Sequence, residues 1–163
     1  STGNGGGIYN EDVLGLEIVE ISGCKAGAGK LGGGIYSGST SHIFAGKTAK
    51  VKNNTSGDTT PNNIYHCIGE NSFIKLGTGE DVHAPQAGME LHITTSVKPT
   101  FDTSITITLN GKEADTVYFV SDDADCLVEY DMLNSNIMLI ANTKTLTIDN
   151  IDPFHPSNTR DRP

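Results

Sequence analysis

Acidic residues form the densest group of chemically reactive side chains in this sequence. Seven Asp and Glu residues lie between Glu113 and Asp131, with no Lys or Arg among them. Three of them, Asp122, Asp123 and Asp125, fall in one predicted turn, and oxygen-rich turns with several carboxylates can bind calcium. The turn lacks the spacing and the glycine of an EF-hand loop. Two interpretations therefore stay open: a calcium site, or a solvated acidic turn.

The other reactive side chains show no spacing that is typical of an active site. None of the five histidines has a second histidine two or four residues away, and the three cysteines contain no C-x-x-C pair. The segment 27–32 matches G-x-G-x-x-G, but no helix is predicted after it to hold a phosphate. No pair of acids recurs in the way that a glycosidase requires. The sequence predicts no catalytic residue and no cofactor except a possible calcium ion, and therefore a protein that is not an enzyme.

Composition and charge narrow the classes of partner. The 163 residues carry a formal net charge of −9, which argues against binding to nucleic acid or to anionic lipid. No apolar run approaches the roughly 18 residues of a membrane helix, so we expect no membrane insertion by this segment. The length suits one domain, or one domain with an attached cap.

An internal repeat is the strongest structural signal. The string Gly-Gly-Gly-Ile-Tyr occupies residues 5–9 and recurs at residues 32–36, and a degenerate copy, Asn-Asn-Ile-Tyr, occupies residues 62–65. Repeats of 20–30 residues that consist of short strands and turns are typical of the coils of a β-solenoid. The sequence therefore predicts an all-β fold with stacked coils over residues 1–96.

The repeat predicts two rows of side chains, because neighbouring residues of a strand point to opposite faces. The inward row consists of Ile8, Ile35 and Ile64, and the outward row consists of Tyr9, Tyr36 and Tyr65. Stacked aromatic side chains bind partners or carbohydrate at low entropic cost, so the tyrosines are the predicted contact surface. Lateral packing between coils is the alternative role.

The repeat disappears after about residue 97, and alternating strand patterns replace it. Strands are predicted at 104–109, 116–120, 126–130, 136–140 and 144–148, with a hairpin at Asn110-Gly111 joining the first two. We interpret residues 97–150 as an antiparallel β cap that closes the C-terminal end of the solenoid. Residues 151–163 form an extended tail, in which Phe154 is a candidate anchor on a neighbouring molecule; a disordered terminus is the alternative.

The glycine-rich repeat and the Asn-rich turn at residues 51–56 resemble the repeats of polymorphic outer membrane protein-type surface proteins. The resemblance is clear over about residues 3–65, although the Phe of the family's Phe-x-x-Asn motif is missing here. It implies a short right-handed parallel β-helix, an extracellular or cell-surface location in a bacterium, and often an adhesive role.

Together these patterns predict a non-enzymatic structural or adhesive segment of an extracellular bacterial surface protein. Its predicted partners are other copies of itself or adjoining coils of a longer chain, with carbohydrate or a host surface as further candidates. Because an open N-terminal coil and a capped C-terminal end are unlike surfaces, head-to-tail assembly into a filament is one expectation. A carbohydrate-binding or polysaccharide-cleaving β-helix module is the alternative.

Overall fold

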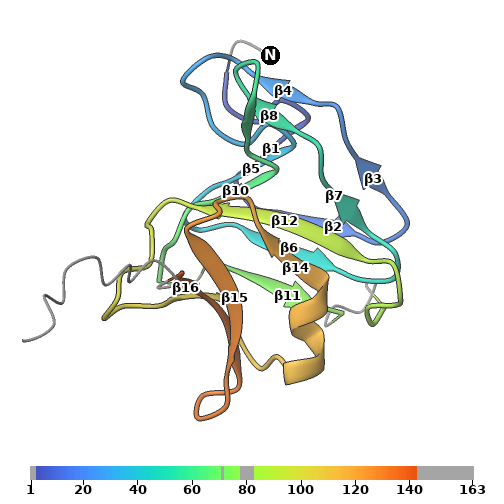
Figure 1. Ribbon diagram of the computed structural model, residues 1–163. Coiled ribbons are helices and arrows are strands. Elements are labelled where there is room, and N and C mark those ends of the chain that lie inside the picture. The colour runs from blue at the N-terminus through green and yellow to red at the C-terminus, as the bar shows by residue number, and fades with distance from the viewer. Residues whose placement is uncertain (1–2, 71, 78–82, 143–163) are drawn as a thin grey trace, which may run out of the picture.

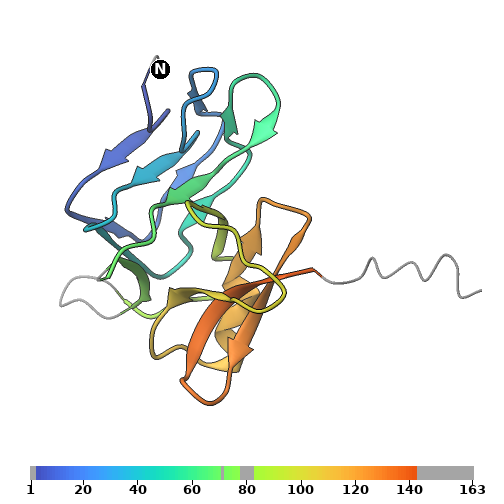
Figure 2. The same ribbon diagram turned by 90° about the vertical axis from the view of Figure 1, so that its left-hand side faces the viewer.

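The computed structural model describes residues 3–70, 72–77 and 83–142. It is a parallel β-solenoid of about four coils, followed by a separate antiparallel sheet (Figures 1 and 2), so the predicted fold class is confirmed. Within the described residues, no helix is long and apolar enough to cross a membrane.

The first two coils have the same order of strands. The first contains β1 (Ile8–Asn10), β2 (Val13–Leu16), β3 (Glu20–Ile21) and β4 (Lys25–Ala26), and the second contains β5 (Ile35–Ser37), β6 (His42–Ala45), β7 (Lys50–Val51) and β8 (Thr55–Ser56). Each strand of the first coil pairs in parallel with its counterpart in the second. The short β9 (Thr60–Pro61) then returns antiparallel to β8.

The third coil is shorter. It contains β10 (Ile64–His66), β11 (Phe73–Leu76) and the first half of β12 (Glu90–Thr95), which pairs with β7. The second half of β12 pairs with β10 and begins the fourth coil. The first face of the solenoid consists of β1, β5, β10 and the second half of β12, and the third face consists of β3, β7 and the first half of β12. The third coil therefore passes directly from its third face to the first face of the fourth coil. It has no counterpart of β4 and β8, the additional paired strands of the first two coils, which we call detour strands.

The C-terminal segment combines one last solenoid strand with the cap. Its elements are β13 (Ile105–Thr108), the 3-10 helix η1 (Glu113–Tyr118), β14 (Phe119–Ser121), β15 (Cys126–Asp131) and β16 (Asn136–Ala141). Strand β14 pairs in parallel with β12, whereas β13, β16 and β15 form an antiparallel sheet in that order. Solenoid pairing thus continues beyond residue 96.

The first face of the solenoid stacks in strict register. Its inward row is Ile8, Ile35, Ile64 and Ile93, and its outward row is Tyr9, Tyr36, Tyr65 and Thr94. The three-residue rows predicted from the repeat are confirmed as placements, and the structure adds a fourth member to each. No Gly-Gly-Gly-Ile-Tyr motif marks this fourth position, which is why the sequence pattern did not reveal it.

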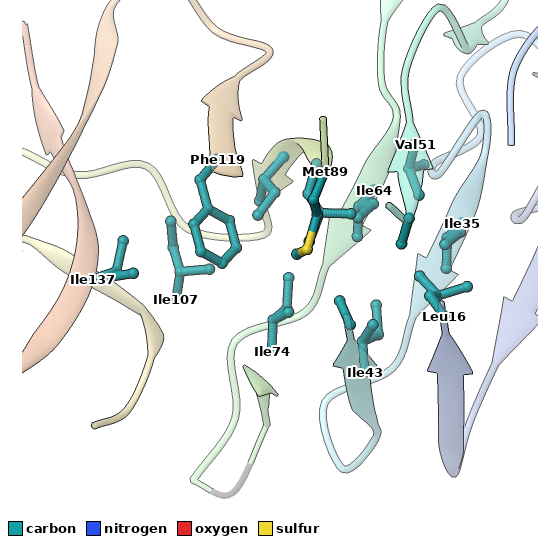
Figure 3. Close-up of a cluster of buried hydrophobic side chains, with 14 of the residues drawn as sticks. Leu16, Ile35, Ile43, Val51, Ile64, Ile74, Met89, Ile107, Phe119 and Ile137 are labelled. Atoms are coloured by element: carbon teal, nitrogen blue, oxygen red, sulfur yellow. The ribbon is translucent and has the colours of Figure 1, made fainter. Parts of the chain in front are cut away.

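The inward rows and the cap share one hydrophobic core (Figure 3). Ile35, Ile43 and Ile64 of the middle coils are fully buried, and so are Ile107 and Ile137 of the cap. Burying such a side chain contributes about 1.5–3 kcal/mol. The cap is therefore a continuation of the solenoid core and covers its C-terminal end.

One local prediction is wrong. The Asn110-Gly111 signal does not join β13 to a returning strand: η1 (Glu113–Tyr118) follows, so the predicted strand at 116–120 is partly helical, and β14 pairs with β12. This pairing of β14 with the edge of a solenoid strand replaces the predicted local hairpin.

The glycine triplets are explained by the corner that precedes the first face. Gly5 and Gly32 both have φ +69°, a conformation that is costly for other residues. The second glycine has no room for a side chain: a Cβ on Gly6 would lie 2.2 Å from the carbonyl oxygen of Gly33, and one on Gly33 would lie 2.4 Å from that of Thr55 in β8. Backbone lies directly against backbone at this corner.

The third coil carries asparagines at the equivalent corner because its surroundings differ. Asn62 and Asn63 occupy the positions of Gly33 and Gly34, as the pairing of Ile64 with Ile35 shows. This coil has no detour strand to press against the corner, so side chains fit. The degenerate third copy of the repeat therefore reflects the shortened coil.

Replacing Gly33 with alanine should destabilise the protein by about 3 kcal/mol, because the methyl group would meet backbone that cannot move aside. Gly38→Ala is the matched control, since neither Gly33 nor Gly38 has a positive φ and a Cβ on Gly38 would meet only the flexible carboxylate of Glu11, at 3.3 Å. Its expected loss is within about 1 kcal/mol, because that side chain can move aside. Urea unfolding measures both values, and equal losses would contradict the backbone-contact explanation.

A row of polar residues lies inside the first face, one position beyond the tyrosines. Asn10, Ser37, His66 and Thr95 are all buried there. The Nε2 atom of His66 lies 3.4 Å from the hydroxyl of Ser72, which in turn donates to the carbonyl oxygen of Ser41 at 3.2 Å. Burial is the main reason that the pKa of His66 falls to about 4.

Acid should therefore destabilise the fold through His66. His66 has a pKa of about 6.5 in the unfolded chain and about 4 in the folded chain. Between pH 6.5 and pH 4 the unfolded chain therefore binds a proton that the folded chain does not bind. The free energy of unfolding decreases as the pH is lowered through this range. The expected contribution is about 3 kcal/mol. His66→Asn, which copies Asn10 of the same row, should lose stability less steeply between pH 7 and pH 4 in urea titrations. Identical pH profiles of the two proteins would refute the role of His66.

Candidate functional site

The three tyrosines form a continuous stack on the outer surface of the first face. The ring centroids of Tyr9 and Tyr36 are 4.9 Å apart with an interplanar angle of 4°, and those of Tyr36 and Tyr65 are 5.9 Å apart with an angle of 11°. Each ring thus covers the face of the next. Only edges point outward along most of the stack, and a sugar ring stacks on aromatic faces rather than edges.

The hydroxyl groups of this stack stay protonated at neutral pH. The thiol of Cys67 lies 3.3 Å from the hydroxyl of Tyr36, and this hydrogen bond is the main reason that the pKa of Tyr36 is raised. A hydrogen bond with Glu11 raises the pKa of Tyr9, and burial raises that of Tyr65. The three hydroxyl groups therefore carry no charge at neutral pH.

Tyr9 ends the stack at the open side of the first coil. Strands β1, β2, β3 and β4 all lie at the edges of their sheets. In the described part of the chain, each therefore has one side of its backbone without a strand partner. An edge of this kind is a template for pairing with another strand. Figure 2 shows β1 as the outermost of the parallel strands β1, β5 and β10.

Side-chain exposure at this edge differs sharply from that of the inner coils. Tyr9 is 56% exposed, Val13 58% and Ile18 77%. Among inward residues, Leu14 is only partly buried, whereas its register partner Ile43 is fully buried. The first coil thus exposes apolar side chains beside charged ones such as Glu11 and Glu20.

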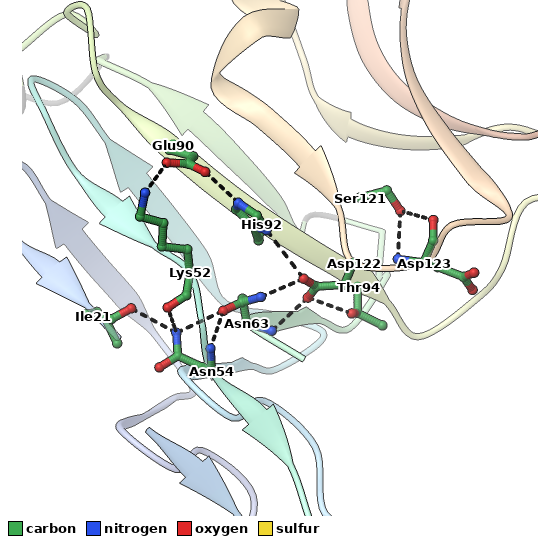
Figure 4. Close-up of polar contacts among 10 residues, drawn as sticks. All are labelled: Ile21, Lys52, Asn54, Asn63, Glu90, His92, Thr94, Ser121, Asp122 and Asp123. Carbon is green, nitrogen blue, oxygen red and sulfur yellow. Dashed lines mark hydrogen bonds and ion pairs between the residues drawn. The ribbon is translucent and has the colours of Figure 1, made fainter. Parts of the chain in front are cut away.

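A second group of polar contacts joins the solenoid to its last strand (Figure 4). The side-chain oxygen of Asn63 accepts hydrogen bonds from the backbone N–H and the side-chain amide of Asn54, at 2.7 and 3.0 Å. Asn54 also donates to the carbonyl oxygen of Ile21 at 2.8 Å. This asparagine ladder satisfies backbone groups at the corners of consecutive coils.

Asp122, which follows β14, binds the Asn63 end of the asparagine ladder. Its carboxylate accepts from the backbone N–H of Asn63 at 2.7 Å, from the Asn63 side-chain amide at 2.6 Å and from the Thr94 hydroxyl at 3.0 Å. The Asp122 side chain is 2% exposed. A buried carboxylate is stable only with such partners, so Asp122 fastens β14 to the solenoid.

His92 connects this carboxylate to an ion pair on the neighbouring surface. Its Nδ1 atom lies 3.8 Å from Asp122, and its Nε2 atom lies 2.8 Å from Glu90. Glu90 also accepts from the ammonium of Lys52 at 2.6 Å, and this bond is the main reason that its pKa is lowered. Glu90 thus joins Lys52 and His92, and Asp122 joins Asn63 and Thr94, in one connected set of polar contacts (Figure 4).

The three acidic side chains of the predicted calcium turn lie in different surroundings. Asp122 faces the asparagine ladder, Asp123 forms an ion pair with Lys98, and Asp125 is exposed. The ion pair is the main reason that the pKa of Asp123 is lowered. Across residues 3–70, 72–77 and 83–142, no group of three or more His, Cys, Asp and Glu side chains is arranged to hold a metal. Calcium binding therefore stays a prediction from the sequence alone.

The remaining predicted residues fall into two groups. Tyr9, Tyr36 and Tyr65 lie together as predicted, but their role in contacts with a partner is not tested by the fold. Phe154, the tail 151–163 and the predicted strand at 144–148 lie outside the described residues. Sequence analysis missed the structural role of Asp122, because its partner Asn63 is 59 residues away.

Comparison with protein-family models, with curated proteins and with solved structures finds no match for this chain.

Asp122→Asn should destabilise the protein by about 2–3 kcal/mol, because one amide hydrogen would then face a donor of Asn63 or Thr94. Asp125→Asn is the matched control: Asp125 is exposed in the same turn, so its expected effect is within about 0.5 kcal/mol. Thermal unfolding followed by circular dichroism measures both. Equal stability of the two variants would show that Asp122 does not fasten β14.

Proposed function

We propose that this chain is a non-enzymatic structural segment of an extracellular bacterial surface protein. In this proposal the chain forms the capped end of a longer β-solenoid assembly, and its first coil stacks on a further coil. That coil belongs either to the same polypeptide or to another copy. The observation that carries the proposal is the position of β1, β2, β3 and β4, which all lie at sheet edges.

The contrast between the two ends of the solenoid supports this function. The C-terminal end is covered by the β13–β16–β15 sheet, whose residues Ile107, Ile137 and Leu139 are buried in the shared core. At the N-terminal end, β1, β2, β3 and β4 each keep one backbone edge without a strand partner in the described part of the chain. Repeat proteins need a polar cap wherever a coil faces water. An uncovered coil of this composition is therefore suited to a partner.

The chemistry of the exposed edge indicates what that partner is. Another coil of the same kind would place a tyrosine on the free face of Tyr9, an apolar residue over Ile8 and backbone groups opposite those of β1. All three contacts repeat what β5 already provides on the other side of β1. The resemblance to polymorphic outer membrane protein-type repeats adds the surface location and the adhesive role to the proposal.

Self-association through this edge is tested with Val13→Lys, which places a charge among the edge side chains. Light scattering and electron microscopy at high concentration should show oligomers or filaments of the natural chain and a monomeric variant. Leu133→Lys is the matched variant at the other end, because Leu133 is 95% exposed in the β15–β16 turn. Loss of assembly in both variants supports head-to-tail filaments, and loss in Val13→Lys alone supports edge-to-edge pairs.

A monomeric natural chain would refute self-assembly and leave an adjoining coil of a longer chain as the partner. Adding a second copy of residues 5–31 before Gly5 tests that case, because it supplies such a coil. The melting temperature should rise by several degrees as exposed apolar area is buried. An unchanged or lower melting temperature would refute coil stacking at this edge. A chain ending at Asn150 shows whether Phe154 and the tail contribute to any assembly.

A further inference from the structure

A cleft lies far along the solenoid from the open first coil, where the third coil meets the cap. Its volume is about 710 Å³, within the range of pockets that bind small molecules. Strand β11 provides one wall, and the turn after β13 together with η1 provides another. The cleft is separate from the surface on which the proposed function rests.

Two lysines give this cleft a local positive charge on an acidic protein. The ammonium of Lys75 lies 4.6 Å from the ring centroid of Phe73 and 5.3 Å from that of Phe44. Lys112 lines the same cleft from the turn after β13 and is exposed. Within the described residues, neither ammonium forms an ion pair. The carboxylate of Asp115 lines the cleft as well, so its three charged lining groups carry one net positive charge, whereas the whole chain carries −9.

The rest of the lining combines an aromatic ring with neutral and acidic hydrogen-bonding groups. Tyr118 contributes the ring, and Asn110 and Asp115 contribute amide and carboxylate groups. A sugar has this same combination, because its C–H face packs on aromatic rings and its hydroxyls both donate and accept. The ring of Phe73 is already covered, because the Lys75 ammonium lies 4.6 Å and the His42 ring 4.8 Å from its centroid. One oxygen of Asp115 already accepts from the backbone N–H of Lys112 at 2.9 Å, and a bare phosphate would leave its other oxygen and the Tyr118 ring without a partner.

We propose that this cleft binds an acidic sugar, with the carboxylate of a hexuronate unit held by Lys75 and Lys112. In this arrangement the hydroxyls of the sugar donate to Asp115 and bond with Asn110. The ring of Tyr118 packs against the apolar face of the sugar. The site recognises a ligand and has no part in a covalent step.

The test uses glucuronate, glucose and inorganic phosphate as probes of the full-length chain. Two-dimensional NMR titration at millimolar concentrations should show glucuronate shifting signals of the cleft residues. Glucose, which lacks the carboxylate, should bind at least about tenfold more weakly. Lys75→Met and Lys112→Met should each weaken glucuronate binding by about tenfold, whereas Lys50→Met, on the third face of the solenoid, should leave it unchanged.

Each contrary outcome overturns the assignment. Absence of shifts with glucuronate would exclude an acidic-sugar site, and equal shifts with phosphate would show an anion site that does not recognise sugar. Equal affinity of natural chain and Lys112→Met would exclude the proposed charge contact. Lys112 is exposed, so this variant remains informative even if Lys75→Met proves unstable. None of these outcomes bears on coil stacking at the N-terminal edge.

Discussion

Direct contact between the backbones of neighbouring coils is the constraint on which this structure depends. At the corner before the first face, Gly6 lies against the carbonyl of Gly33 in the next coil, and Gly33 lies against Thr55 in strand β8 of its own coil. Side chains at these points would push the coils apart. The contact sets the spacing at which the tyrosine rings stack and the isoleucines meet beneath them. The repeated glycines are therefore a packing requirement, and they carry no information about a ligand.

The hydrogen bonds among Asn54, Asn63 and Asp122 form at the coil where glycine is no longer required at the corner. The third coil lacks a detour strand, so Asn62 and Asn63 can occupy the corner, and Asn63 reaches both Asn54 and Asp122. The free space left by the missing strand is thus filled by hydrogen bonds. Because Asp122 follows β14, the same bonds hold the last parallel strand in place. One shortened coil changes both the sequence of the repeat and the way in which the solenoid ends.

The sequence was informative where the structure repeats. Two copies of Gly-Gly-Gly-Ile-Tyr are enough to predict the register of Ile8 on Ile35 and the stack of Tyr9 on Tyr36, because both follow from alternation along a strand. The turn after β13 was mispredicted for the opposite reason. Asn110-Gly111 favours a local hairpin, but the completed edge of β12 offers β14 a longer-range partner. Asp122 and the lysine-lined cleft depend on such distant contacts too, so no local pattern marks them.

The tyrosine stack limits how this surface can recognise a partner. A face-to-face stack hides ring faces, so Tyr36 presents mainly its edge and hydroxyl, and the far side of Tyr65 lies next to Thr94 of the fourth coil. Only Tyr9 has a ring face that no described coil covers. A ligand that binds flat aromatic faces therefore gains little from the length of the stack, whereas another coil gains one ring contact and one set of backbone bonds. This difference favours a coil over a sugar as the partner of the first face.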